Sequence, residues 1–319
     1  MMGLLIFRER LKNFYGKYDI YVIAVLKFIL SFLIFYLLNQ NIGSMPLLKN
    51  PVVPLVLALV CSFMPYGITA VIASVFMLMH LFSISAEIAV VTAIVLFLVG
   101  ILYYGQQPGD SVLLLVTPLM FALKIPYVVP LVAGLACGVS AVIPVSCGIC
   151  IYYVLLYVKQ NTGLLTNGAQ AEALQKYSQA VSIVINNKQM LVMITAFACS
   201  LVIVWVLHRM SFNYSWMAAV IMGMIAQVTV IFLGSMKIHV SLKIGELILG
   251  ILASLLIVAV YQLFVFAVDY SRVEYVQYED DEYYYYVKAV PKMMVTEPDV
   301  QVHKISSVKG NSRGSREKS

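Results

Sequence analysis

The stretch "IGELILGILASLLIVAVYQLFVFA" occupies residues 244–267 and contains a single charged residue, Glu246. It exceeds the roughly 20 apolar residues with which an α-helix crosses a bilayer. Six further segments read in the same way. They are residues 20–38, 66–82, 86–104, 141–158, 190–207 and 216–233. The chain is therefore predicted to cross a membrane many times.

The composition supports the same fold class. The chain is 62% hydrophobic and 11% charged, with a mean hydropathy of +0.92. A soluble domain is about half apolar and about a quarter charged. Residues 20–268 hold only nine Lys or Arg and four Asp or Glu, while the other charges lie in the two ends. We therefore predict a transmembrane domain at 20–268 between two polar ends, which excludes a soluble globular domain.

Three apolar segments are too short to cross alone. They are residues 51–64, 111–123 and 126–139, and all contain or adjoin proline. Because each of them either spans or re-enters, we expect an all-α bundle of 8–10 transmembrane helices, several of them short and proline-broken.

The distribution of basic residues predicts the orientation. Residues 1–19 form a basic, amphipathic segment that is expected at the cytoplasmic surface, and the tail after Asp269 carries eight Lys or Arg. Lys and Arg concentrate on the cytoplasmic side, so both termini are predicted to be cytoplasmic and the number of crossings even. The loop 159–188 then falls outside, where Leu174, Tyr177, Val181 and Val184 follow the stripe of a short amphipathic helix. The layout is typical of a bacterial multi-pass protein of the plasma membrane.

A proline-broken phrase occurs twice, as "LKNPVVPLV" from residue 48 and "LKIPYVVPLV" from residue 123. With one inserted residue, Tyr127, segments 48–61 and 123–137 align. The shared features are a lysine, two prolines and a cysteine at matching places, and the lysines and prolines are Lys49, Pro51, Pro54, Lys124, Pro126 and Pro130. We interpret the pair as an internal repeat, whose copies are parallel or inverted depending on which short segments cross.

Short, proline-interrupted segments in corresponding places of two halves are typical of transporters with a central site. Proline removes a backbone donor, and broken backbone inside a bilayer must be covered by protein or water. The lysines and Glu246, which could meet Lys27 or Lys124, are therefore candidates for a substrate or ion path. The competing interpretations are that the lysines extend to the membrane surface and that Glu246 is solvated at a helix end.

Cys147 and Cys150 form a C-x-x-C pair, whose spacing resembles that of the quinone-linked disulfide oxidoreductases. All five cysteines lie in apolar stretches, where small packing residues are expected. The four histidines are scattered, so the sequence predicts no metal site and no cofactor. A redox enzyme is the least favoured of three interpretations, and we expect no enzyme activity.

After the last span, "RVEYVQYEDDEYYYYVKAV" alternates apolar and polar residues around an acidic turn. This pattern predicts a cytoplasmic β-hairpin within residues 269–291, followed by a disordered basic tail at 292–319. A lone hairpin is marginally stable, so a protein partner is predicted at 272–290. The candidate contacts are its tyrosines, Tyr275, Tyr278, Tyr283, Tyr284, Tyr285 and Tyr286.

The sequence thus favours a transport-type protein, a carrier or permease-like subunit, over a membrane scaffold or assembly factor that acts through the hairpin and tail. The lipid bilayer is an expected partner, no nucleic acid is expected, and the sequence does not predict an oligomeric state. The substrate, the direction of transport and any coupling ion also stay open.

Overall fold

The computed structural model describes residues 2–106, 108–167, 186–210, 214–238, 244–265, 274–279 and 284–289. The predicted amphipathic helix of the 159–188 loop, the basic tail and Tyr283 lie outside these residues. The chain divides into two units, residues 14–266 and the two ends.

Seven described helices are long and apolar enough to cross a membrane. Their bounds are α1 (Met2–Asn41), α3 (Tyr66–Ile84), α4 (Ala86–Gln106), α7 (Val142–Asn167), α9 (Lys188–His208), α10 (Ser215–Ile238) and α11 (Ile244–Val265). Each of the seven helices covers one of the predicted apolar segments almost completely. Helix α1 extends beyond its segment at the N-terminal end, and α7 extends beyond its segment at the C-terminal end. Helix α1 contains a non-helical residue, Tyr18, beside the predicted start of the first span.

The three short apolar segments form short helices, α2 (Val52–Ser62), α5 (Ser111–Ala122) and α6 (Val128–Ala136). Two 3-10 turns, η1 (Pro108–Asp110) and η2 (Val139–Ala141), precede α5 and α7. Helices α5 and α6 have 12 and 9 residues. At about 1.5 Å per residue they measure roughly 18 and 14 Å, against about 30 Å of hydrocarbon. Neither crosses a bilayer alone.

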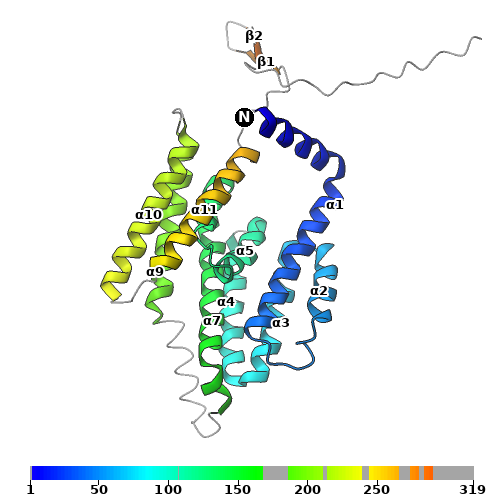
Figure 1. Ribbon diagram of the computed structural model, residues 1–319, viewed down its shortest axis with the longest axis vertical. Helices are drawn as coiled ribbons and strands as arrows, with labels where there is room; N and C mark the ends of the chain where they lie inside the picture. The colour runs from blue at the N-terminus through cyan, green and yellow to red at the C-terminus, as the bar shows by residue number, and fades with distance from the viewer. Residues whose placement is uncertain are drawn as a thin grey trace, which may run out of the picture. The chain divides into compact units, whose positions relative to one another are not determined.

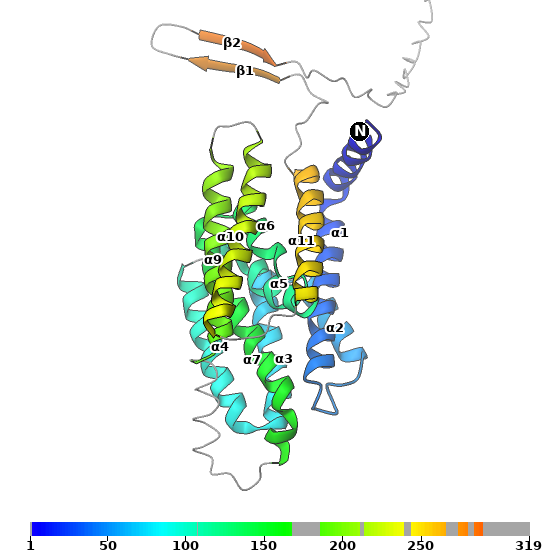
Figure 2. The ribbon, with the colours of Figure 1, turned by 60° about the vertical axis from the view of Figure 1, so that its left-hand side comes forward.

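The helices of the larger unit pack around two hydrophobic cores. The first core joins α1, α2, α3 and α4, and the second joins α6, α9, α10 and α11. Helices α5 and α7 contribute to both, so they form the seam between the two cores. Figures 1 and 2 place α5 in the middle of the bundle, with α9 and α10 on one side and α1 on the other.

Large apolar side chains cover the outer faces of the long helices. On α10, for example, Met217, Ile225 and Phe232 are more than half exposed. A soluble protein does not expose contiguous apolar surface on this scale. The exposed faces and the seven long helices together make the chain a multi-pass membrane protein.

Aromatic and polar residues gather where α9, α10 and α11 approach one another at one end. The Arg209 guanidinium lies 4.4 Å from the Trp205 ring centroid, and Gln262 Nε2 donates to the Trp216 carbonyl at 3.0 Å. Tryptophan and tyrosine concentrate at membrane–water interfaces. This end of the bundle has the composition of such an interface.

In the smaller unit, β1 (Glu274–Glu279) and β2 (Tyr284–Ala289) pair antiparallel. The register sets Tyr275 opposite Lys288 and Tyr278 opposite Tyr285. The residues that join the strands lie outside the described part of the chain, so a complete cytoplasmic hairpin stays a prediction.

Candidate functional site

The connection between α5 and α6 has an unusual backbone. The Lys124 N–H donates to the Phe121 carbonyl at 3.1 Å, and the Ile125 N–H donates to the Met120 carbonyl at 3.0 Å. These two bonds form a Schellman motif, which places Lys124 at the position where glycine is usual. Lys124 has φ 63°, one of two non-glycine residues with positive φ in the described ranges. The sequence enforces the break because Pro126 disfavours helical geometry at Ile125.

A left-handed conformation costs an L-residue roughly 1–2 kcal/mol, which glycine would avoid. Strain of this kind persists where the surrounding structure imposes it, and it concentrates at functional sites. The lysine in place of glycine at this position is therefore a candidate functional residue.

The Lys124 side chain contacts α11. Its Nζ lies 3.4 Å from Glu246 Oε1, and the two side chains are 73% and 50% exposed. Glu246 was expected to meet Lys27 or Lys124, and the structure brings it to Lys124. Lys27 lies elsewhere, with its Nζ donating to the Met64 carbonyl at 3.2 Å and 5.0 Å from the Tyr66 ring centroid.

Helix α11 packs closely against the connection between α5 and α6. At Gly250, one turn after Glu246, an added Cβ would lie 2.9 Å from the Tyr127 ring and 3.1 Å from the Lys124 carbonyl oxygen. A side chain at position 250 would have to displace the Tyr127 ring or move α11 away from the α5–α6 connection. On the opposite side, α5 crosses α7 at Gly148, where a Cβ would lie 2.6 Å from Thr117 Cβ.

Two cavities meet at Lys124. The first, of about 310 Å³, lies among α1, α3, α4, α5 and α7, and the second, of about 340 Å³, lies among α7, α9, α10 and α11. Four residues line both, namely Phe121, Lys124, Tyr152 and Leu156. Cavities of this size hold small molecules in other proteins.

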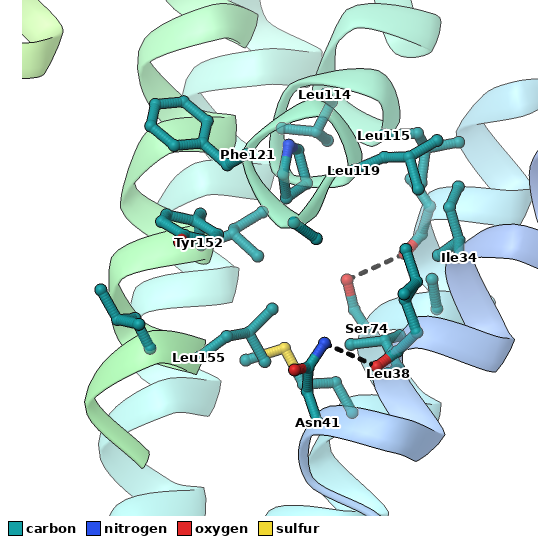
Figure 3. A pocket seen from close by; sticks show the side chains of 18 of the residues that line it. Ile34, Leu38, Asn41, Ser74, Leu114, Leu115, Leu119, Phe121, Tyr152 and Leu155 are labelled. Carbon is teal, nitrogen blue, oxygen red and sulfur yellow. Dashed lines mark hydrogen bonds between the residues drawn. The ribbon is translucent and has the colours of Figure 1, made fainter. Parts of the chain in front are cut away.

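An aromatic stack stands between the cavities. The Phe121 and Tyr152 rings lie 4.7 Å apart at 29°, and Phe121 also stacks on Phe197 with centroids 5.5 Å apart. Figure 3 shows Phe121 from α5 and Tyr152 from α7 on the same side of the first cavity. The stack and Lys124 thus occupy the boundary that a molecule passing between the cavities would cross.

The first cavity has an apolar interior and a basic rim. Of the described residues that line it, Lys124 and Lys159 are the exposed ones, and the rest are buried or half-buried. No carboxylate lines it among these residues. Asn41 accepts a 2.6 Å hydrogen bond from Lys159 Nζ at its side-chain oxygen. Figure 3 shows Asn41 and Ser74 facing the space between α1 and α7.

The two copies of the repeated phrase share a helix start and differ before it. Pro51 and Tyr127 are equivalent N-cap residues, with φ/ψ of −61°/−17° and −65°/−15°. Pro54 and Pro130 each occupy the third helical position, where a missing N–H leaves no intrahelical bond unmade. The inserted Tyr127 thus takes the position that Pro51 has in the first copy, and Pro126 lies one residue earlier.

The environments of the copies differ. Lys49 is exposed, follows a loop and has no positive φ, and its carbonyl accepts from Asn39 Nδ2 at 3.1 Å. Helix α2 exposes Val52, Val56 and Leu59 and packs on α3. Helix α6 is buried against α9 and α11. The structure therefore brings Lys124, Pro126 and Glu246 together at the second cavity, while Lys49, Pro51 and Pro54 lie apart from both cavities.

Several residues of the site were not found by sequence reasoning. Phe121, Tyr152 and Lys159 belong to it, and so does Asn41. Tyr152, Leu155 and Lys159 repeat at helical spacing along one face of α7, but ordinary packing produces the same spacing. Cys147 is buried and Cys150 half-buried, and both are free thiols one helical turn apart on α7. Among the described residues, no group of three His, Cys, Asp or Glu could hold a metal ion.

Comparisons with protein families, with curated proteins and with solved structures give no match. The function must therefore be argued from the site itself.

Proposed function

We propose that the protein is a membrane carrier or permease-like transport subunit, whose substrate passes between the two cavities beside Lys124. The observation that carries this proposal is the lysine in a left-handed conformation at a helix break shared by both cavities. Broken helices with exposed charge at the seam between two helix groups are the usual construction of a transport site.

Alternating access would act at the seam between the two cores. Helices α5 and α7 contribute to both cores, and the stacked rings of Phe121 and Tyr152 line both cavities. Movement of one core against the other at this seam would separate the stack and expose the Lys124–Glu246 pair to each side in turn. Rigid-body movement of one helix group against another is how such carriers work.

Accessibility of single cysteines tests the proposal without knowledge of the substrate. Cys199 is the exposed cysteine, so Cys199→Ala provides the background. In that background, Ser74→Cys probes the first cavity and Ser235→Cys the second. Leu47→Cys is a control in the exposed loop after α1.

A membrane-impermeant maleimide is applied to intact cells and to inverted vesicles, and labelling is compared with the Cys199→Ala background. For a carrier we expect both cavity cysteines to be labelled from either side, and Cys at 47 from one side alone. Cavity cysteines that react from one side alone would contradict alternating access.

The exposed side chains of β2 favour a second candidate function, that of a membrane scaffold. Tyr284 and Tyr286 are 63% and 77% exposed, and Tyr285 and Val287 on the other face of β2 are each 47% exposed. A partner that added a strand or covered one face would stabilise this two-stranded sheet. Deleting residues 270–319 separates the two functions, because a carrier keeps its cavity accessibility and flux whereas a scaffold loses its partner.

A further inference from the structure

The proposed transport site also indicates the class of its substrate, an inference that rests on the proposed function. We propose that the first cavity binds an anionic lipid from the bilayer, with its headgroup at Lys124 and Lys159 and an acyl chain among the apolar walls.

The charge distribution favours an anion at the rim. Two lysines, Lys124 and Lys159, are the exposed members of the lining, and none of the described lining residues is acidic. Basic side chains beside a membrane attract anionic lipid headgroups. Lys159 Nζ donates to Asn41 Oδ1 at 2.6 Å, which holds this ammonium group at the cavity. Glu246 partners Lys124 from the second cavity, on the other side of the Phe121–Tyr152 stack. Both lysines line the first cavity, so an anionic headgroup there would be attracted to each of them.

The interior favours a hydrocarbon chain over a polar solute. The walls include Ile34, Met77 and Leu115, which are all buried. Filling such a space with an acyl chain removes apolar surface from water at about 25 cal/mol per Å². A small polar anion such as phosphate would leave these walls without contact.

A few polar groups of the lining could contact the glycerol region of a lipid. Pro118 lacks the N–H that would bond the Leu114 carbonyl, and both residues line the cavity. Asn41 Nδ2 donates to the Leu37 carbonyl at 2.8 Å, and Ser74 Oγ donates to the Ala70 carbonyl at 2.8 Å. Figure 3 shows these two bonds at the edge of the cavity. The lining thus combines basic, uncharged polar and apolar side chains, which match the chemical parts of an anionic lipid.

The test measures binding of phosphatidylglycerol with a fluorescent acyl chain to the purified full-length protein in detergent. Phosphatidylcholine with the same chain is the zwitterionic probe, and inorganic phosphate is the competitor without a chain. We expect saturable binding of phosphatidylglycerol, weaker binding of phosphatidylcholine, and no competition by millimolar phosphate.

Three variants locate the site. Lys124→Gln and Lys159→Gln should each weaken binding about tenfold, the change that one charged hydrogen bond of roughly 1.4 kcal/mol produces. Lys49→Gln is the matched control, because Lys49 is an exposed lysine away from both cavities, and it should leave binding unchanged. Ala73 is buried and lines the first cavity, so the larger side chain of Ala73→Leu would fill part of the interior. This variant should weaken lipid binding although both lysines remain.

A photoreactive acyl chain on the wild-type protein gives a second measurement that does not depend on folding of a variant. Crosslinks should map to walls such as Met77 or Leu115. The inference is overturned if Lys49→Gln weakens binding as much as Lys124→Gln, if both lipids bind equally, or if phosphate competes fully. It is also overturned if crosslinks map only to the outer helix faces. If the lipid binds but the cavity cysteines react from one side alone, transport is overturned and lipid binding at the first cavity stands. If the cysteines react from both sides but the lipid does not bind, this inference is overturned and the proposal of transport stands.

Discussion

Replacing Lys124 with glycine or with alanine separates the backbone strain from the ion pair. Both substitutions remove the contact with Glu246, but alanine keeps the unfavourable φ of 63° whereas glycine relieves it. Left-handed geometry costs a non-glycine residue roughly 1–2 kcal/mol. Glycine loses about 0.5–1 kcal/mol more conformational entropy on folding than alanine. The balance makes Lys124→Gly the more stable variant by up to about 1.5 kcal/mol.

In the control, at Lys159, the difference in stability between the glycine and alanine variants should have the opposite sign. Lys159 lies within α7 with ordinary helical geometry, so Lys159→Gly should be less stable than Lys159→Ala by about 1 kcal/mol. At roughly 2–4 °C per kcal/mol for a domain of this size, the two pairs should differ by a few degrees in opposite directions. Thermal unfolding in detergent, followed by the fluorescence of the two tryptophans, measures both pairs. If Lys124→Ala exceeds Lys124→Gly in stability as much as Lys159→Ala exceeds Lys159→Gly, the left-handed conformation carries no strain, and the functional role inferred from it fails.

Three further predictions concern the same site. Gly250→Ala should destabilise the protein by about 1–3 kcal/mol, because its Cβ would meet the Tyr127 ring and the Lys124 carbonyl. Gly100 lies within α4 and its added Cβ would meet nothing within 4 Å, so Gly100→Ala should stabilise the protein slightly. Equal unfolding midpoints for the two variants in the same thermal assay would contradict this difference in packing. Glu246→Gln removes the carboxylate next to Lys124 and should tighten binding of the anionic lipid severalfold, and weaker binding would show that Glu246 helps to hold the ligand. Replacing Cys147 and Cys150 together with alanine should leave cavity accessibility and lipid binding unchanged, and a loss of thiol-dependent activity in the double variant would revive the redox interpretation.

The long helices could be predicted from the sequence because their signals are local. Continuous apolar runs bounded by proline or polar residues locate α3, α9 and α10 within a few residues. The short helices were also predictable, since Pro51 and Pro126 limit where α2 and α6 begin. The repeated phrase encodes the same helix start twice because N-cap geometry depends on the neighbouring few residues alone.

The site could be predicted only in part, because it depends on residues far apart in the chain. Glu246 and Lys124 were candidate partners, but Lys27 was equally eligible by sequence, and only packing decides between them. The left-handed φ at Lys124 was not predictable, since the Schellman position favours glycine and the sequence has lysine there. The cavities and the Phe121–Tyr152 stack arise where α5 crosses α7, which no local pattern specifies.

Only the second copy of the repeated phrase, through Lys124, contributes to the proposal of transport, because Lys49, Pro51 and Pro54 line neither cavity. Glu246 alone would prove little, because a carboxylate in the first turn of α11 is stabilised by the helix dipole. Lys49 alone would prove equally little, because it is exposed at the end of a loop. Lys124 has no such local explanation, since glycine in its place would relieve strain and remove a charge from the membrane domain. Lys124 lies at the boundary of two cavities, at a position where glycine would be less strained. Its presence is most simply explained by what its ammonium group binds.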